Sequence, residues 1–323
     1  MKDVTALGEI LIDFTPNGIS EQGNPILVAN PGGAPANVLV SLSKLGMKTE
    51  FIGCVGKDHF GDFLVSTLQS KGVHTDGIGY SNVHTTLAFV HIDEHGDRSF
   101  SFYRQPGADM MLKKEDVDLQ LISQSRIFHV GSISMTNDPV RETTLTALKH
   151  AKEHNVIVSF DPNLRPPLWQ NLEEAKKQIN TILTYADVVK VSEEELAFLT
   201  GSEDITIGAE LLYDQYNLSI LFITLGGKGS YAYSYNGLVF VPGFLVKAID
   251  TTGCGDAFLA GVLYQLMENE GIYGSLPEKA IKEILKFGNA MGAYVAMRKG
   301  GIPSMPTLEQ LQEFMVSGIT VVK

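Results

Sequence analysis

Residues 250–261 of the chain read DTTGCGDAFLAG, a glycine-rich turn that leads directly into an apolar helical pattern. The N–H groups of Gly253, Cys254 and Gly255 would lie at a helix N-terminus, where the helix dipole favours an anion such as phosphate. Asp256 falls in the first helical turn beside them. A carboxylate next to a bound phosphoryl group can take the proton of a substrate hydroxyl. The same residues also fit an ordinary turn in which Asp256 only complements the helix dipole.

Short runs of apolar, often β-branched residues occur along the rest of the chain, with helical patterns between them. Continuous runs of this kind are typical of strands buried on both faces, as in a parallel sheet. The alternation predicts a doubly wound α/β domain with crossover connections. The predicted strands are Val4–Leu11, Thr49–Val55, Ile127–Val130, Val156–Phe160, Val188–Val191 and Ile220–Leu225, and the predicted helices are Asn37–Leu45, Val140–His154, Phe258–Met267 and Glu278–Met297.

Two regions interrupt the alternation. Thr86–Ile92 and Ser99–Tyr103 flank a charged turn and predict a hairpin, and Asp13–Val28 is strand-like and punctuated by Pro and Gly. These pieces predict a small accessory sheet inserted into a single domain. Gly229–Gly243 predicts a second hairpin, which turns at Asn236-Gly237.

Composition excludes several classes of protein. The 323 residues are 44% hydrophobic and 19% charged, which is typical of a globular chain and not of a disordered one. The net charge of −12 argues against a basic surface that binds nucleic acid. Two cysteines exclude a disulfide scaffold, and no run approaches the roughly 18 apolar residues of a membrane helix. With no secretion signal at the N-terminus, the sequence predicts a cytoplasmic protein without nucleic-acid or membrane partners.

Three further loops border predicted strands in the same way. Residues 30–37 (NPGGAPAN) place two glycines before a helix, residues 161–165 (DPNLR) follow a strand, and residues 224–229 (TLGGKG) follow another strand. Ligands bind at the carboxyl ends of strands in open α/β sheets, so these loops are candidate ligand contacts. Each of the two glycine loops also fits an ordinary turn.

Motifs of other enzyme classes are absent from the sequence. It has no G-x-x-x-x-G-K-[ST], no G-x-G-x-x-G after the first strand, no H-E-x-x-H and no G-x-S-x-G. An NAD-dependent dehydrogenase, which would also be α/β, is therefore disfavoured. The histidine pairs His91/His95 and His150/His154 lie at a turn and near a helix end, and neither predicts a metal site.

The motifs taken together resemble the ribokinase family of sugar kinases, also called the PfkB group. The resemblance rests on Gly32-Gly33-x-x-x-Asn37, on Gly53-Cys-Val-Gly56-Lys-Asp58-x-x-Gly61 and on Asp250-Thr-Thr-Gly-Cys-Gly-Asp256. Within this family, three further stretches resemble fructokinases. They are residues 102–110, 161–169 and 190–201.

The resemblance implies a three-layer α/β/α domain spanning residues 1–323, with a β-sheet lid formed by about residues 13–30 and 86–108. It implies that ATP phosphorylates the 6-hydroxyl of D-fructose, with Mg²⁺ and K⁺ as cofactors, and a homodimer formed through the lid. The apolar residues of the lid hairpin also favour a buried lid face.

Roles for individual residues come from the same resemblance. Asp256 would be the catalytic base, and Gly253, Cys254 and Gly255 would form an anion hole for the phosphoryl group. Sugar contacts would be Asp13, Gly33, Asn37, Arg104 and Arg165, and ATP contacts would be Lys190, Thr224, Gly226, Gly229 and Asn289. Glu195 would hold Mg²⁺ through water, and a monovalent cation would be bound by Asp250, Thr252, Val295, Arg298, Gly300 and Ser304.

Two departures from the family pattern are visible in the sequence. Cys254 lies where the family usually has Ala, and Ser192 lies where the family's N-x-x-E motif has Asn, so the match to the family's magnesium motif is incomplete. Alternatives stay open at this point. The chain could phosphorylate 2-keto-3-deoxygluconate, whose carboxylate a lid arginine could bind, or it could be another sugar kinase of this family. It could also be a sugar sensor without catalytic activity.

Overall fold

The large sheet forms the centre of the computed structural model, which describes residues 2–92, 98–269 and 276–317. Its strand order is β13-β12-β11-β10-β9-β8-β1-β4-β5. The pairs from β11 to β5 are parallel, as predicted, and β12 and β13 add an antiparallel edge. The strands are β1 (Lys2–Leu7), β4 (Thr49–Gly56), β5 (His74–Ser81), β8 (Ser125–Gly131), β9 (Ile157–Asp161), β10 (Val188–Ser192), β11 (Ile220–Thr224), β12 (Gly229–Ser234) and β13 (Gly237–Pro242).

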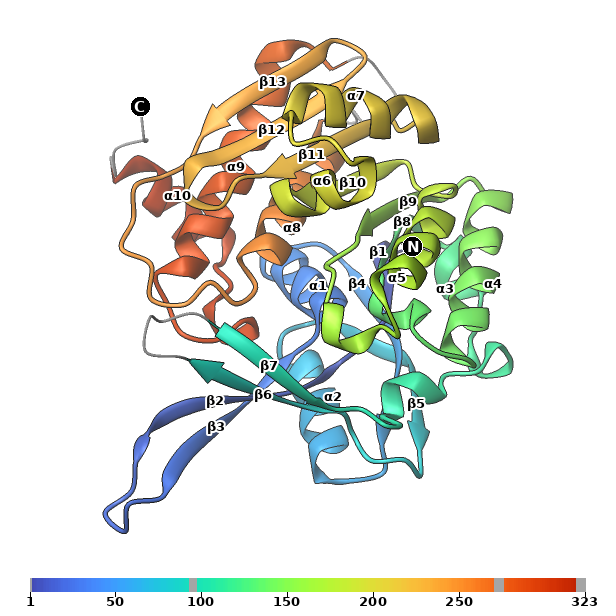
Figure 1. The fold of residues 1–323 in the computed structure, drawn as a ribbon, viewed down its shortest axis with the longest axis vertical. Helices are drawn as coiled ribbons and strands as arrows, with labels where there is room; N and C mark the ends of the chain where they lie inside the picture. Colours follow the sequence, from blue (N-terminus) through green and yellow to red (C-terminus); the bar gives the residue numbers. More distant parts are fainter. Residues whose placement is uncertain (1, 93–97, 270–275, 318–323) are drawn as a thin grey trace.

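Helices cover both faces of this sheet (Figure 1). Alternate residues of β11 belong to different hydrophobic clusters: Ile220 and Phe222 face one helical layer, and Leu221 and Ile223 face the other. The first layer holds α1 (Ala34–Lys44), α2 (His59–Ser70), α8 (Cys254–Glu268), α9 (Glu278–Ala296) and α10 (Leu308–Val316). The second holds α3 (Gln120–Ser123), α4 (Val140–Glu153), α5 (Leu172–Leu183), α6 (Glu193–Thr200) and α7 (Ile205–Tyr216). The predicted three-layer α/β/α arrangement is confirmed.

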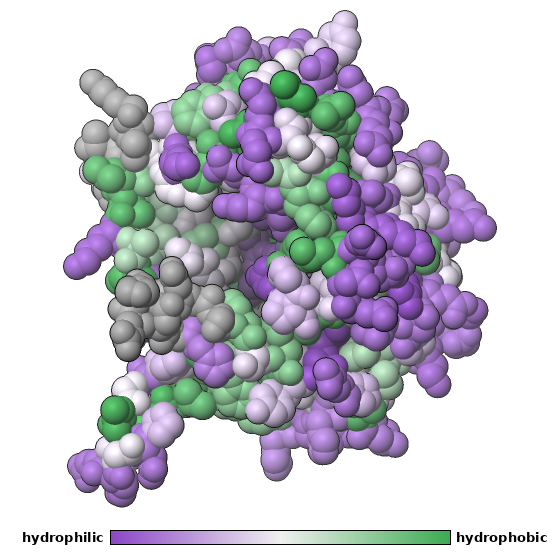
Figure 2. All heavy atoms as spheres, in the orientation of Figure 1, coloured by the Kyte–Doolittle hydropathy of each residue, from purple (hydrophilic) through white to green (hydrophobic). Residues whose placement is uncertain are grey.

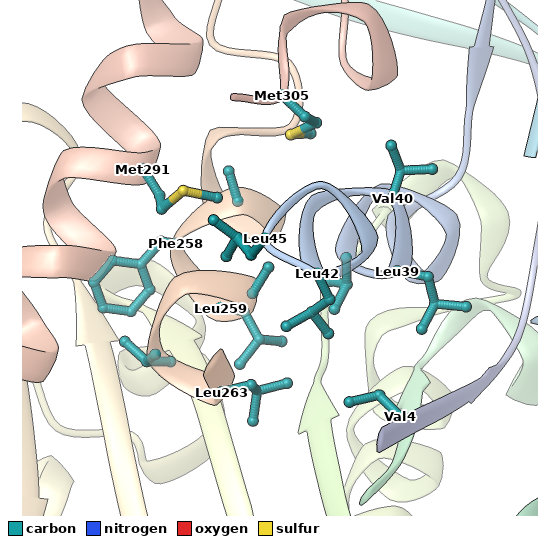
Figure 3. Close-up of a cluster of buried hydrophobic side chains, with 14 of the residues drawn as sticks. Val4, Leu39, Val40, Leu42, Leu45, Phe258, Leu259, Leu263, Met291 and Met305 are labelled. Atoms are coloured by element: carbon teal, nitrogen blue, oxygen red, sulfur yellow. The ribbon is translucent and has the colours of Figure 1, made fainter. Parts of the chain in front are cut away.

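The contact between α1 and α8 fixes the two helices that later supply the site. Leu42 of α1 lies beside Leu259 and Leu263 of α8, and all three side chains are fully buried (Figure 3). Burying a side chain of this size contributes roughly 1.5–3 kcal/mol. The N-terminal ends of α1 and α8 are therefore held in a fixed relation by the core beneath them.

A separate four-stranded sheet lies at one side of the large domain (Figure 1). Its order is β3-β2-β6-β7, from β2 (Leu11–Ile19), β3 (Pro25–Gly32), β6 (Leu87–Ile92) and β7 (Arg98–Tyr103). The predicted accessory sheet is present, and β6 and β7 pair antiparallel as the predicted hairpin requires. The turn of that hairpin lies outside the described residues. We call this sheet the lid sheet.

Three sequence predictions need correction at their edges. The run Val4–Leu11 is not one strand, because the chain leaves the large sheet after Leu7 and enters the lid sheet at Leu11. The helix predicted from Asn37 begins at Ala34, since Pro35 is well suited to the first turn of a helix. The second hairpin turns one residue earlier than predicted, so that Gly237, with φ 87°, is already the first residue of β13.

No helix in the described ranges is long and apolar enough to cross a membrane.

Candidate active site

A cavity of about 700 Å³ lies between the carboxyl ends of the large sheet's strands and the lid sheet. Figure 2 shows the recess near the centre of this face, with hydrophilic residues visible inside it. The lid sheet contributes Leu11, Asp13, Phe100 and Phe102 to the wall. Among the residues from the large domain are Glu9, Gly33, Asn37, Asn163, Arg165, Lys190, Glu195, Gly253, Gly255 and Asp256. Loops far apart in the sequence therefore converge here.

Asp256 lies in the first turn of α8, at the bottom of this cavity, and is 5% exposed. Its Oδ2 accepts a hydrogen bond from Asn37 Nδ2 at 2.8 Å, and its Oδ1 accepts one from Asn163 Nδ2 at 2.9 Å. Burial, and then the nearby Asp161 carboxylate, raise the pKa of Asp256 to about 6. A carboxylate held in place by two amides, with a pKa near neutrality, is well suited to act as a general base.

The two amides reach Asp256 from different loops. Asn37 is the fourth residue of α1, and its Oδ1 is buried without a hydrogen-bond partner among the described residues. Asn163 follows β9 with φ 43°, a left-handed conformation that Asn tolerates better than most residues. Because an unpaired buried acceptor is costly, Asn37 Oδ1 is positioned to accept a hydrogen bond from a ligand hydroxyl.

Lys190 of β10 lies close to the N-terminal end of α8. Its Nζ forms a buried ion pair with Asp161 Oδ2 at 3.0 Å. A Cβ at residue 255 would lie 3.0 Å from that Nζ, so glycine at Gly255 leaves room for the ammonium group. Lys190 lines the cavity and brings a positive charge close to the predicted anion hole.

The predicted anion hole is the turn before α8. Gly253 is the helix N-cap with φ 79°, a conformation that favours glycine. The Cys254 N–H already donates to the Thr251 carbonyl at 3.2 Å, which differs from the expectation of three open donors. The first-turn N–H groups that follow have no acceptor within the helix, as at any helix start. The turn therefore still offers donors to an anion.

Asp13 and Arg165 lie on the wall of the cavity, as predicted for sugar contacts. Burial raises the pKa of Asp13 to about 7, against the opposing effect of the Arg165 guanidinium. The Arg165 side chain donates to the carbonyls of Asn163 and Leu164, and its guanidinium lies 6.0 Å from the ring centre of Phe100 in the lid sheet. Arg165 thus contacts both sides of the cavity.

Arg104 has a different position from the one expected for a sugar contact. It follows β7 and is buried, with its Nε donating to Asp109 Oδ2 at 2.7 Å. Its Nη1 donates to Thr136 Oγ1 at 2.8 Å, and its Nη2 donates to the Ile133 carbonyl at 3.3 Å. Arg104 is not among the residues that line the cavity. Its role as a sugar contact stays a prediction that this geometry does not support.

The residues predicted to bind ATP, apart from Lys190, form a second group. It lies where β11 ends, β12 begins and β13 ends. Gly229 has φ 122°, and a Cβ there would collide with the Val241 carbonyl, so the turn requires glycine. Asn289 of α9 donates to the Val241 and Pro242 carbonyls and accepts from Ser230 Oγ at 2.8 Å. Thr224 and Gly226 lie in the same turn, and none of these four predicted residues lines the cavity.

The predicted magnesium residue, Glu195, lines the cavity and also caps α6. Its Oε2 accepts from the Ser192 N–H and its Oε1 from the Leu164 N–H, both at 2.8 Å. Ser192 Oγ accepts from the Glu195 N–H, so Ser192 completes a capping box. Each carboxylate oxygen keeps a second lone pair, which fits a role in binding metal-bound water.

The predicted monovalent-cation residues lie around one turn. Asp250 Oδ1 accepts from the Thr252 N–H at 2.8 Å and Oδ2 from the Gly300 N–H at 2.9 Å, which joins two segments. Carbonyl and carboxylate oxygens are the donors that hard cations prefer, so this set fits such an ion. The remaining predicted ligands are Val295, Arg298 and Ser304, the last of which hydrogen-bonds Gly301.

Three residues of this site were not singled out by sequence reasoning. Asn163 and Asp161 belong to the 161–165 loop, from which only Arg165 was chosen, and the loop motif itself was the available signal. Glu9 lines the cavity beside Asp13 and is 3% exposed. Nothing in the sequence pattern distinguishes Glu9 from a surface carboxylate at the end of a strand.

The fold and this cavity define a carbohydrate kinase. Residues 1–308 match the pfkB family carbohydrate kinases, and the chain belongs to that family.

Proteins and solved structures similar to this chain include several fructokinases. The chain is 41% identical over 315 residues to a probable fructokinase-4 of Arabidopsis thaliana, covering 97% of this chain and 96% of that protein. It is 42% identical to fructokinase-2 of Solanum lycopersicum, covering 98% and 96%. Among solved structures, fructokinase of Xylella fastidiosa with bound ATP gives a TM-score of 0.89 at 34% identity, covering 98% and 99%. Fructokinase of Vibrio cholerae O395 with fructose, ADP and calcium gives 0.86 at 36%, covering 97% and 99%.

Proposed function

We propose that this protein transfers the γ-phosphoryl group of ATP to the 6-hydroxyl of D-fructose. The observation that carries the proposal is Asp256, a buried carboxylate held by Asn37 and Asn163 at the start of α8, facing the cavity. The fructokinases with which this chain aligns over nearly its full length support fructose as the sugar.

The proposed mechanism follows from this geometry. Asp256 accepts a hydrogen bond from the sugar hydroxyl and takes its proton as the oxygen attacks the γ-phosphorus. The N–H groups at the start of α8, together with the Lys190 ammonium, stabilise the negative charge on the phosphoryl oxygens. Removing one such donor typically lowers kcat by on the order of 10²–10³. Phe100 and Phe102 exclude water from the reacting groups, which limits hydrolysis of ATP.

Two metal ions are part of the proposal. Glu195 would hold Mg²⁺ through water, and this ion would neutralise phosphate charge. Asp250, with the carbonyls of its turn, would hold K⁺ next to the anion hole.

The state of Arg104 favours a neutral sugar over a sugar acid. Asp109 neutralises the Arg104 guanidinium in a buried pair, and Thr136 and Ile133 occupy further donors. A carboxylate on the substrate would need a free positive charge at this place. We therefore propose fructose as the substrate in preference to 2-keto-3-deoxygluconate.

The proposal includes a homodimer and a cytoplasmic location. Ile19, Ile26, Leu27 and Val28, on the β2–β3 hairpin of the lid sheet, are 39–73% exposed, which is an apolar edge that a second copy of the chain would cover. Light scattering of the purified protein measures whether it is a dimer.

A substrate panel tests the proposed activity. ADP release is measured with ATP and, in turn, fructose, ribose, 2-keto-3-deoxygluconate and a nucleoside, and the product is identified by an assay specific for fructose 6-phosphate. We expect fructose to give the highest kcat/KM by about 100-fold. A higher value with the sugar acid would replace fructose, and ADP release no faster than in the sugar-free control would favour the sensor.

A further inference from the structure

The chain passes four times between the large domain and the lid sheet. The first crossing, around Glu9, leads from β1 to β2, and the second, at Gly33, leads from β3 to α1. The third precedes β6 at Thr86, and the fourth follows β7 at Arg104. Asp109 joins the third and fourth, because it accepts hydrogen bonds from both Thr86 and Arg104.

Glu9 joins the first and second crossings. Its Oε1 accepts a hydrogen bond from the Ala34 N–H at 2.8 Å. Ala34 is the first residue of α1, and the N-cap, Gly33, has no side chain that could cap the helix. Glu9 therefore supplies, from another part of the chain, an acceptor for the N–H of the first residue of α1, at a helix start whose N-cap offers no side-chain acceptor.

The surroundings of Glu9 indicate that this contact belongs to the sugar site. Glu9 lies in the cavity wall with Asp13, Gly33 and Asn37. The Glu9 backbone carbonyl packs against Gly33 so closely that a Cβ there would collide with it. Its Oε2 is buried and has no hydrogen-bond partner within the described residues. A purely structural cap would not need to keep a carboxyl group buried at the edge of a ligand cavity, where burial raises its pKa to about 7.

We propose that Glu9 is a positioning residue for the sugar, which acts by fixing the start of α1. Through the Ala34 N–H it sets where Gly33 and the first turn of α1 lie relative to Asp13 in the lid sheet. The rest of α1 is held by its packing on α8, so Asn37 and Asp256 keep their relation when Glu9 is changed (Figure 3). The proposal rests on the proposed sugar kinase activity.

The test is a double-mutant cycle that removes the hydrogen bond from either side. Glu9→Ala removes the acceptor, and Ala34→Pro removes the donor at a helix position that tolerates Pro. We expect each variant to raise the sugar KM about tenfold, with kcat within about threefold of wild type. The double variant should be no worse than either single one, because both changes break the same contact. Glu9→Gln, whose amide oxygen can accept the same N–H, should keep the wild-type KM.

Two controls make each outcome decisive. Asp204→Ala removes an N-cap of α7 that bonds Thr206 and Ile207, away from the cavity, and should lower the melting temperature without changing the sugar KM. Hydrogen exchange of residues 30–38 should accelerate in Glu9→Ala whether or not the enzyme accepts fructose. KM is measured with the sugar of the panel that gives the wild-type chain its highest kcat/KM. A sugar other than fructose in this place would contradict the proposed function and would leave the test of Glu9 valid. Additive effects in the cycle, a Gln variant as impaired as Ala, or unchanged exchange would overturn the role of Glu9.

Discussion

The proposed sugar end and nucleotide end of this site are built differently. At the sugar end, carboxyl groups and amides of Glu9, Asp13, Asn37 and Asp256 line the cavity. Glu9 and Asn37 each have a buried oxygen with no hydrogen-bond partner among the described residues. At the nucleotide end, glycines with positive φ shape the turn around Gly229, and Asn289 uses its polar atoms to join β12, β13 and α9.

The difference indicates what each end recognises and what each will tolerate. In the proposed function Asp13 and Asp256, whose pKa values are raised, act directly on the sugar, so activity should be sensitive to pH and to isosteric substitutions at these two residues. Backbone shape defines the nucleotide end, so only substitutions that add a Cβ at a strained glycine should disturb it. The predictions below test this division in order of expected effect.

The largest effect is expected for Asp256→Asn. This change keeps the shape of the side chain but removes the base, so kcat should fall by about 10³-fold or more while ATP still binds. The measurement is steady-state turnover together with calorimetric ATP binding. Retention of most of the activity would rule out Asp256 as the base.

Thermal unfolding supplies the control for this variant. The folded-state pKa of Asp256 is raised from 3.8 to about 6, so the folded protein loses stability from this group as pH rises from about 4 to 6. The new asparagine side chain has no charge to bury. After a 180° rotation of the Asn37 amide, Asn37 Oδ1 can accept a hydrogen bond from the N–H group of this new side chain. We therefore expect Asp256→Asn to melt a few degrees higher than wild type at pH 8, with a smaller gain near pH 5 and none below about pH 4.

A smaller effect is expected at the nucleotide end for Gly229→Ala. The added Cβ would collide with the Val241 carbonyl at φ 122°, so the turn must move. ATP KM should rise on the order of tenfold and the melting temperature should fall, as expected for strain of about 1–3 kcal/mol. Gly227→Ala is the matched control, because no atom lies within 4 Å of its added Cβ, and its ATP KM should stay within about twofold. Equal effects of the two changes would contradict a turn defined by Gly229.

The smallest effects concern the pH profile. The kcat/KM for the sugar should decrease about tenfold per unit below pH 6, because Asp256 must be deprotonated to act as a base. The hydrogen bond from Asn37 lowers the pKa of Asp256, so Asn37→Ala should move this acidic limb to higher pH. A limb that stays in place would show that Asp256 does not determine the profile.

The alternation of strands and helices was predictable because strands buried on both faces leave uninterrupted apolar runs, as at Ile220–Thr224. The anion-hole turn was equally visible, since Gly253 and Gly255 directly precede an apolar helix. The contact between Asn163 and Asp256 was not predictable from spacing, because 93 residues separate them and only the folded sheet brings them together. The buried pairing of Arg104 was not predictable for a related reason: its motif does not reveal that Asp109, five residues later, forms an ion pair with it.

The lid sheet is built from two excursions of the chain, and each excursion returns to the point from which it left. Glu9 meets Ala34 across the ends of the first, and Asp109 bridges the ends of the second. A loop closed in this way can change in length or sequence without displacing the domain from which it extends. Substrate range can therefore diverge in these two insertions over evolutionary time, while the phosphate-transfer machinery below them stays unchanged.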